Sequence, residues 1–241
     1  MPEGWNRVAE IRRRQIESGA DITFSRVFVP YYANLIANLT PSSLLEVGCG
    51  TGHLSAFLAQ SVSTLTALEP SPGMYAVAQK VLRRKRVRLL KCSIQDYKSD
   101  TCFDMLISHM CAQAVEDLDL FLKAVVSHMH KTSVFVFAIP HPCFYNSYKS
   151  LFPPDEYDYM RDIRKMISFT ITRDPGSAIS GIPYNHRPLS TYFSHLRDHC
   201  LCVRGFDEII PEPGIQALYG SSWEVPRYCA FQAQRCSGMT A

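Results

Sequence analysis

The ten residues from Leu44 to His53, LLEVGCGTGH, constrain the fold of this chain more than any other segment. An apolar run typical of a buried strand ends beside an acidic residue and passes into three glycines, after which an amphipathic helix pattern begins. In an open α/β sheet, ligands bind beyond the carboxyl ends of the strands, where such a turn lies. Because glycine has no Cβ, the backbone of this turn can approach a ligand closely. The segment therefore predicts a ligand-binding turn in an α/β sheet.

The spacing of the glycines discriminates between ligands. A dinucleotide-binding turn has the pattern G-x-G-x-x-G, whereas Gly48, Gly50 and Gly52 follow G-x-G-x-G and position 53 is His. A nicotinamide oxidoreductase is therefore the least favoured enzyme class. Glu69 follows the next apolar run, and an ionised carboxylate there can accept hydrogen bonds from two hydroxyl groups.

Strand and helix patterns alternate along the first half of the chain, which is typical of parallel βαβ units. We expect strands near residues 44–47, 65–69, 87–91, 103–108 and 133–139, and helices at 51–60, 72–82 and 119–129. A last helix at 188–199 and strands at 201–206 and 227–234 complete the pattern. Residues 1–40 have helical spacing, and residues 141–187 show no clean period. A stretch of this length with weak periodicity is usually functional.

The acid-x-G-x-G-x-G turn with Glu69 resembles the motifs of class I S-adenosylmethionine (SAM) methyltransferases of the small-molecule type. The resemblance is detailed over residues 44–139 and looser in the tail. It implies a Rossmann-like, doubly wound, seven-stranded and mostly parallel sheet with helices on both faces. It also implies SAM as the cofactor, with the glycine turn facing its methionine half, Glu69 binding the ribose hydroxyls and Met74 packing against adenine.

The cofactor-binding residues implied by the resemblance come from the ends of the first four strands. They are Glu46, Gly48, Cys49, Gly50, Gly52, His53, Glu69, Pro70, Met74, Ser93, Ile94, Gln95 and Ser108. The family usually places an acid after the third strand to bind the adenine amine, and this chain has Ser93 there. Gln95 or Asp96 is an alternative for that role.

The segments 139–144, 184–192 and 225–228 resemble a subgroup of these enzymes in which the region after the fifth strand covers the acceptor. We therefore expect one domain, 1–241, with a helical cap at 1–40 and a substrate lid insertion at 141–187. Aromatic side chains in the insertion suit an aromatic or amphipathic acceptor, or they anchor the lid to the sheet. The expected substrate-binding residues are Tyr31, Tyr145, Tyr184 and Arg187.

Methyl transfer from a sulfonium mainly needs in-line positioning, and a base is useful when the acceptor is a hydroxyl or a protonated amine. Histidine suits this role because its ordinary pKa lies near neutrality. His141, His186 and His109 are the candidate catalytic residues. Each can instead be a hydrogen-bonded structural histidine.

Charge and composition limit the kinds of partner that we expect this chain to bind. The formal charge of +3 is small and gives no case for nucleic acid, and no apolar stretch approaches the ~20 residues of a membrane span. We expect neither membrane nor nucleic acid as a partner, no metal site, and a cytoplasmic monomer or homodimer. The nine cysteines form no C-x-x-C pair, so Cys92, Cys202 and Cys229 are expected to be reduced thiols.

The sequence thus predicts a SAM-dependent methyltransferase that acts on an O or N atom of a small, aromatic or amphipathic molecule and yields S-adenosylhomocysteine, as in a biosynthetic pathway. Two alternatives keep the fold. One is a SAM-binding enzyme that catalyses a cyclisation or rearrangement without methylation. The other is a non-catalytic binding scaffold, which the intact glycine turn and Glu69 disfavour because a scaffold has no need of them.

Overall fold

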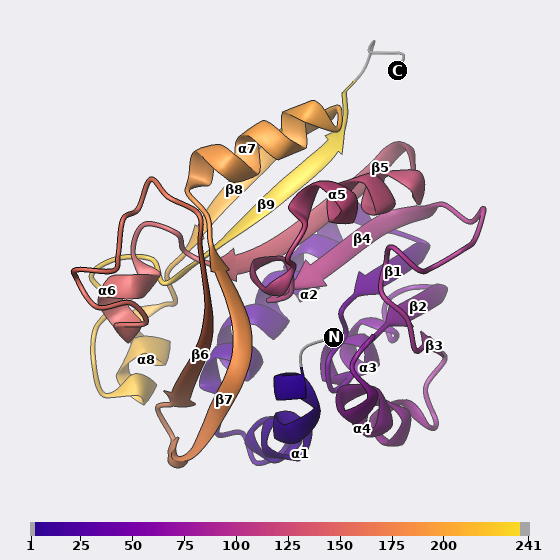
Figure 1. Cartoon of the computed structure of the whole chain (residues 1–241). Helices are drawn as coiled ribbons and strands as arrows, with labels where there is room; N and C mark the ends of the chain where they lie inside the picture. The colour runs from indigo at the N-terminus through magenta and orange to yellow at the C-terminus, as the bar shows by residue number, and fades with distance from the viewer. Residues whose placement is uncertain (1–2, 237–241) are drawn as a thin grey trace.

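A seven-stranded sheet forms the centre of the computed structural model, which describes residues 3–236 (Figure 1). Its strands lie in the order β3-β2-β1-β4-β5-β9-β8. Their bounds are β1 Ser43–Val47, β2 Thr64–Leu68, β3 Arg88–Leu90, β4 Phe103–His109, β5 Met129–Pro140, β8 Leu201–Ile209 and β9 Tyr228–Arg235. Strands β1 to β5 pair in parallel, and β9 is antiparallel to both of its neighbours. The predicted fold class is confirmed.

The strand order reverses at β1, which pairs with β2 on one side and β4 on the other. In such a sheet a crevice opens at the reversal, beyond the carboxyl ends of the strands. The turn at 48–52 follows β1 and Glu69 follows β2, so the topology brings both to this crevice.

Helices cover both faces of the sheet and leave its central strands buried. Helices α2 (Val29–Leu39), α3 (His53–Leu58) and α4 (Pro72–Leu82) contribute to one apolar cluster, and α5 (Leu118–Ser127) and α7 (Leu189–Asp198) contribute to the other. This double cover explains why residues 134–140 of β5 are continuously apolar and buried. The start of α4 is fixed by Ser71, whose Oγ accepts a hydrogen bond from the amide of Met74 and precedes Pro72 at the first helical position.

The N-terminal helix α1 (Glu3–Glu17) lies between α4 and strand β7 (Figure 1). The Oδ1 atom of Asn6 accepts hydrogen bonds from Ser71 Oγ at 2.7 Å and from the Gly73 amide at 2.9 Å. On the other side, a Cβ atom on Gly4 would overlap the carbonyl oxygen of Gly181 in β7. A π-helix, η1 (Thr23–Phe28), connects α1 to α2. Helix α1 is therefore held by two separate parts of the molecule.

The segment 141–187, predicted without regular structure, contains a long hairpin. It holds α6 (Tyr145–Lys149) followed by the antiparallel strands β6 (Ile163–Ile171) and β7 (Asp174–His186), which form a second sheet. Its pairing shifts register between Ile167 and Ser168 and again between Phe169 and Ile171, which weakens the two-residue alternation that marks a strand. Short elements near the chain's other bends are η2 (Ala112–Ala114), α8 (Pro213–Gln216) and η3 (Ala217–Tyr219).

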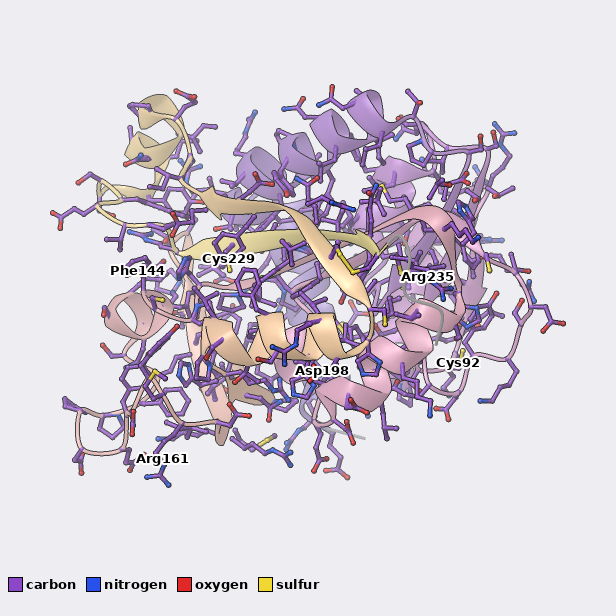
Figure 2. The ribbon with its side chains drawn as sticks, turned by 90° about the horizontal axis from the view of Figure 1, so that it is seen from above. Cys92, Phe144, Arg161, Asp198, Cys229 and Arg235 are labelled. Atoms are coloured by element: carbon purple, nitrogen blue, oxygen red, sulfur yellow. A yellow bond between two sulfur atoms is a disulfide. The ribbon has the colours of Figure 1, made fainter. Side chains whose placement is uncertain are left out.

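A disulfide joins Cys202 in β8 to Cys236, just after β9 (Figure 2). The prediction that Cys202 is a reduced thiol is therefore wrong, because the antiparallel pairing of β8 with β9 brings two cysteines 34 residues apart to a Cα–Cα distance of 5.2 Å. Cys92 and Cys229 are free thiols, as predicted. Within residues 3–236, every helix is too short or too polar to cross a lipid bilayer.

We predict that Cys236→Ser lowers the free energy of unfolding by about 2–4 kcal/mol, because the disulfide restricts the unfolded chain. Chemical denaturation without reductant measures the effect. Cys200→Ser is the matched control, since Cys200 is a free thiol at the same sheet edge. Equal stability of the two variants would contradict a stabilising disulfide.

Candidate active site

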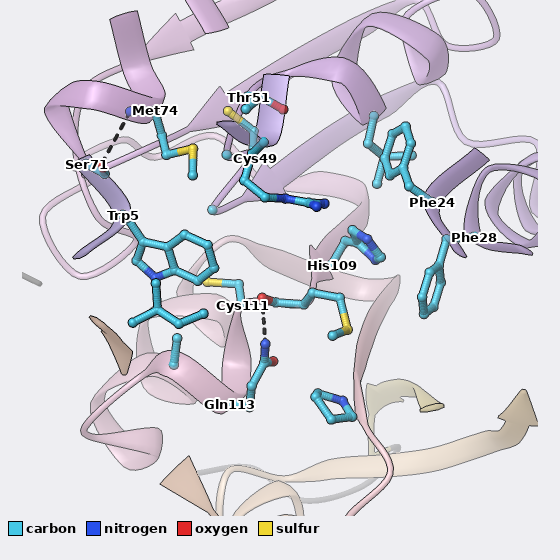
Figure 3. Close-up of a pocket in the computed structure, with 18 of the residues that line it drawn as sticks. Trp5, Phe24, Phe28, Cys49, Thr51, Ser71, Met74, His109, Cys111 and Gln113 are labelled. Atoms are coloured by element: carbon cyan, nitrogen blue, oxygen red, sulfur yellow. Dashed lines mark hydrogen bonds between the residues drawn. The ribbon is translucent and has the colours of Figure 1, made fainter. Parts of the chain in front are cut away.

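A cavity of about 340 Å³ opens at the carboxyl ends of β1, β2 and β4 (Figure 3). This volume lies within the range of small-molecule sites. Its walls combine the sheet edge, helix α1, the η1 segment and the β6–β7 hairpin. The predicted cofactor residues that line it are Glu46, Gly48, Cys49, Gly50, His53, Glu69, Pro70 and Met74.

The glycine turn has the backbone that its sequence predicts. Gly48, Gly50 and Gly52 all have positive φ, at 74°, 56° and 77°. A Cβ atom on Gly48 would lie 2.5 Å from the Sγ of Cys111, so the turn packs against the segment after β4 with no room for a side chain. A Cβ atom on Gly50 would meet no protein atom within 4 Å, so this part of the cavity wall leaves space beside the backbone for a ligand.

Glu69 connects the turns that follow β1 and β2. Its Oε2 accepts a hydrogen bond from the Gly50 amide at 2.7 Å, and its Oε1 accepts one from the Ser71 amide at 2.8 Å. Burial raises the pKa of Glu69 to about 7, against the lowering effect of the two amides. An ionised carboxylate offers about four lone-pair positions, so these amides leave room for two hydroxyl donors.

Glu46 lies behind the turn and is almost fully buried. Its carboxylate accepts a hydrogen bond from Ser55 Oγ, which holds helix α3 against the end of β1. Burial raises the pKa of Glu46 to about 8, with a further contribution from the charge of Glu69. The cavity floor thus contains two carboxyl groups that titrate near neutral pH.

Five of the predicted cofactor residues do not line the cavity: Gly52, Ser93, Ile94, Gln95 and Ser108. Ser93 donates a hydrogen bond from its Oγ to Asp96 at 2.6 Å, so the two side chains cap the loop after β3 instead of facing the cavity. Ser108 is buried in β4, and its hydroxyl has no hydrogen-bond partner within residues 3–236.

Gln113 and Trp5 take positions that the sequence did not indicate. The Oε1 atom of Gln113 is buried and, among the described residues, accepts no hydrogen bond, while its Nε2 donates to the carbonyl of Met110 at 2.8 Å (Figure 3). Trp5 of α1 and Met74 of α4 face the same part of the cavity (Figure 3). Neither Gln113 nor Trp5 belongs to a motif, so only the packing of α1 and of the segment after β4 places these two residues at the cavity.

His109 is the predicted catalytic histidine that lines the cavity. Its Nδ1 lies 3.4 Å from the hydroxyl of Tyr32, and its ring packs edge-on against Phe28 with 4.5 Å between centroids. Burial lowers the pKa of His109 to about 3. The imidazole is therefore neutral at physiological pH and a weak base.

His141 and His186 lie outside the cavity lining. The Nε2 of His141 lies 3.1 Å from Glu208 Oε1, and its Nδ1 accepts a hydrogen bond from the Cys143 amide at 3.2 Å. The Nε2 of His186 pairs with the carbonyl of Tyr159 at 3.0 Å. Each ring is engaged by protein groups away from the cavity, so neither imidazole lines it, and a catalytic role for either stays a prediction.

Of the four predicted substrate residues, two line the cavity and two do not. Tyr145 and Tyr184 line the cavity. Tyr31 does not, because its hydroxyl donates to Asp207 Oδ2 at 2.7 Å on β8. Arg187 is buried and donates hydrogen bonds to the carbonyls of Val115 and Glu116, so it ties β7 to the loop after β4 instead of contacting a ligand.

The wall opposite the sheet edge is mostly apolar and was largely missed from the sequence. Its apolar side chains come from η1, the hairpin and β9: Phe24, Phe28, Ile167, Phe169, Ile171, Ile182, Pro183 and Tyr228. An ion pair interrupts this wall, with Arg12 Nη2 lying 2.6 Å from Asp21 Oδ2. The alternation of Ile167, Phe169 and Ile171 is the signal that could have found the hairpin wall.

No three His, Cys, Asp or Glu side chains come together in a metal-binding arrangement anywhere in residues 3–236. The donor set of the cavity also differs from a metal site, since Glu46 and Glu69 are held by a hydroxyl and amides, and Asp21 is paired with Arg12.

Part of the chain is similar to known methyltransferases. Residues 45–137 match the sequence family described as "Methyltransferase domain". The malonyl-acyl-carrier protein O-methyltransferase of Priestia megaterium is 28% identical over 98 residues, which cover 40% of this chain and 36% of that relative. The match therefore spans just over a third of the relative's length.

Solved structures match the fold over nearly the whole chain. A SAM-dependent methyltransferase from Clostridium acetobutylicum gives a TM-score of 0.68 at 17% identity, covering 97% of this chain and 99% of that structure. The 1,6-didemethyltoxoflavin N1-methyltransferase of Burkholderia thailandensis, solved with its substrate and S-adenosylhomocysteine, gives 0.58 at 15% identity, covering 98% and 91%. The chain thus has the fold of these SAM-dependent methyltransferases, as the sequence predicted, and residues 45–137 match the methyltransferase domain.

We predict that Gly4→Ala weakens the binding of S-adenosylhomocysteine about tenfold without unfolding the sheet, because a Cβ there displaces α1 from β7 at a cost of about 1–3 kcal/mol. Calorimetry measures the affinity, and circular dichroism verifies the fold. Gly176→Ala is the matched control, since a Cβ at Gly176 meets no atom within 4 Å. Identical affinities in both variants would show that α1 does not shape the cofactor site.

We predict that the ligand-free protein loses stability as the pH rises from about 5 to 8. The folded chain keeps a proton on Glu46 up to a pKa of about 8, whereas the unfolded chain releases it near 4.5, so the folded state binds more protons in this window. Glu46→Gln should reduce the slope of the free energy of unfolding against pH, and the effect of the missing titration should reach roughly a few kcal/mol at pH 8. Unfolding at several pH values measures it, and Glu224→Gln, at an exposed site, should keep the wild-type slope.

Proposed function

We propose that this protein is a SAM-dependent methyltransferase that transfers a methyl group to an O or N atom of a small molecule. The observation that carries the proposal is Glu69, a buried carboxylate fixed by the amides of Gly50 and Ser71 beside the glycine turn. The match of residues 45–137 to the methyltransferase domain supports it. The similar N1-methyltransferase of Burkholderia thailandensis, solved with S-adenosylhomocysteine bound, also supports it.

The residues of the cavity fit SAM. When bound, SAM supplies an activated methyl group on a sulfonium, so the protein's task is to position the acceptor in line and to exclude water. Glu69 would accept hydrogen bonds from the ribose hydroxyls. The free Oε1 of Gln113 is an acceptor of the kind that the adenine amine needs, and Met74 and Trp5 offer apolar surface for the ring. This assignment replaces the sequence-based one to Ser93, Gln95 or Asp96.

The apolar wall supports an aromatic or amphipathic acceptor. The hairpin strands β6 and β7 place Ile167, Phe169 and Tyr184 on the cavity, which agrees with a lid role for residues 141–187. Helix α1 lies on the hairpin and on α4 at once, which agrees with a cap role for residues 1–40. In this arrangement the cap and the lid together exclude water from the reacting atoms.

His109 would act as a hydrogen-bonding group rather than as the base of a proton transfer. Tyr32 is fully buried, and its hydroxyl finds its partner in His109 Nδ1. If the hydroxyl donates, the imidazole proton resides on Nε2, because the bond made by one ring nitrogen selects the tautomer of the other. Because His109 is a weak base, we expect the methylated atom of the acceptor to carry a free lone pair without first losing a proton to this imidazole. Monomeric or homodimeric state and cytoplasmic location stay predictions.

We predict that Glu69→Gln weakens SAM binding at least about tenfold at pH 8, since the ionised carboxylate is lost as an acceptor for two hydroxyls. The wild-type affinity should fall about tenfold from pH 8 to pH 6, because SAM binds the ionised form of a group whose pKa is about 7. The variant should lack this pH dependence. Calorimetric titration of SAM at both pH values measures these effects, and Ser93→Ala is the control outside the cavity.

The same protein, incubated with SAM and a panel of aromatic acceptors, tests the reaction through the release of S-adenosylhomocysteine. Release that depends on the acceptor supports methyl transfer. A product that requires SAM without consuming it would replace the proposal with a cyclisation or rearrangement. Absence of SAM binding in the wild type would favour a scaffold, and unchanged affinity in Glu69→Gln would remove Glu69 from the ribose site.

A further inference from the structure

Arg227 precedes β9 in the segment 225–228 and is buried, with 8% of its surface exposed. Three aromatic rings surround its guanidinium. The Cζ atom lies 3.8 Å from the ring centre of Tyr148, 4.1 Å from that of Trp223 and 5.8 Å from that of Tyr219. We call Arg227 and these three rings the Arg227 cluster. The rings fix the plane of the guanidinium and lower its conformational freedom.

The guanidinium of Arg227 is a buried cation without a counter-charge. Within residues 3–236, no carboxylate lies within 4.0 Å of it, and its N–H groups donate to no acceptor. The Nε1 of Trp223 is a second buried donor in the cluster with no partner in the same range. Buried polar groups are normally hydrogen-bonded, and an unpaired buried charge is costly. Trp223 Nε1 is such an unpaired buried donor, and the cation beside it has no counter-charge, so the cluster offers two groups that an anion would satisfy.

Two rings of the Arg227 cluster line a second cavity beside the main one, whereas Arg227 and Trp223 themselves line neither. Tyr148 and Tyr219 line a second cavity of about 30 Å³, which is large enough for a small polar group. The two cavities share six lining residues: Asp21, Thr23, Tyr145, Phe169, Ile171 and Tyr228. A molecule in the main cavity can therefore extend one end toward the cluster.

The charges around the second cavity favour an anion. Lys149 lines it, and its Nζ lies 4.6 Å from the ring centre of Tyr148. Asp21 is the carboxylate among the described residues of this lining, and it is already paired with Arg12 at 2.6 Å. Lys149 and Arg227 thus leave uncompensated positive charge beside the second cavity.

We propose that the Arg227 cluster binds an oxyanion, a carboxylate or a phosphate, carried by the methyl acceptor at the end remote from the methylated atom. This inference rests on the proposed function and narrows its substrate class to amphipathic organic anions. The planar fork of Arg227 matches two oxygens of either group, and the indole N–H of Trp223 offers a further donor. The apolar body of the acceptor then lies between Tyr145 and the hairpin, toward the methyl donor. Arg227 is a specificity-determining residue in this arrangement.

The experiment is calorimetric titration of the protein saturated with S-adenosylhomocysteine. The probes are phenylacetate, phenyl phosphate and the neutral isostere phenylacetamide. The wild type should bind at least one of the two anions about tenfold more tightly than the amide, the difference expected of charge-assisted hydrogen bonds. Arg227→Met should lose that difference while its affinity for S-adenosylhomocysteine stays within about twofold of the wild type. A preference for phenylacetate or for phenyl phosphate identifies which oxyanion the site accepts.

Arg204→Met is the matched control, because it removes the same charge from an exposed position on β8 and should leave all affinities unchanged. Arg227→Lys keeps the charge without the planar fork and should retain only part of the anion preference. It also replaces Arg227→Met as the test if the latter fails to fold, which loss of S-adenosylhomocysteine binding would reveal.

The outcomes separate this inference from the proposed function. If the wild type binds S-adenosylhomocysteine but binds the amide as tightly as both anions, or binds none of the three, the anion site is refuted and the methyltransferase proposal stands. Full anion preference in both Arg227 variants also refutes it. If the wild type fails to bind S-adenosylhomocysteine, the proposed function itself has failed.

Discussion

The pair of hydrogen bonds that Glu69 accepts from Gly50 and Ser71 is the interaction on which the rest of the site depends. The parallel pairing of β1 with β2 brings the two turns together, and the carboxylate then locks them in one arrangement. The same Ser71 caps α4 and donates to Asn6 of α1, so a single contact region aligns turn, helix and cap. Because the carboxylate is buried with few charged neighbours, its ionisation near neutral pH sets how strongly it can hold a ligand.

The half of the site that faces the donor could be read from the sequence because its determinants are local. A glycine turn, an acid at a strand end and a Ser-Pro helix start each act within a few residues, and parallel pairing brings strand ends to one edge. Most of the predicted residues there line the cavity. The exceptions are Gly52 at the end of the glycine turn, three residues after β3 and Ser108 on β4. Ser93 bonds to Asp96 and Ser108 is buried, and these arrangements depend on packing that the sequence pattern does not reveal.

The half that faces the acceptor could not be predicted, because it is assembled from α1, η1, the hairpin and β9, which are distant in sequence. The register shifts between β6 and β7 interrupt the alternation of side chains, so the sequence pattern did not indicate these two strands. Residues picked for their chemistry, such as His141 and Arg187, proved to hold the ends of strands and loops together through carboxylate and carbonyl partners. The family match covers residues 45–137 and contains none of these four segments.

Helix α1 has a consequence for the order of events. It contacts α4 beside the glycine turn through Asn6 and contacts β7 of the hairpin wall through Gly4, so one helix supports two walls of the cavity. A displacement of α1 would therefore open both walls at the same time. Two ligands in this cavity would then be exposed to solvent together, and neither could leave while the other stayed enclosed.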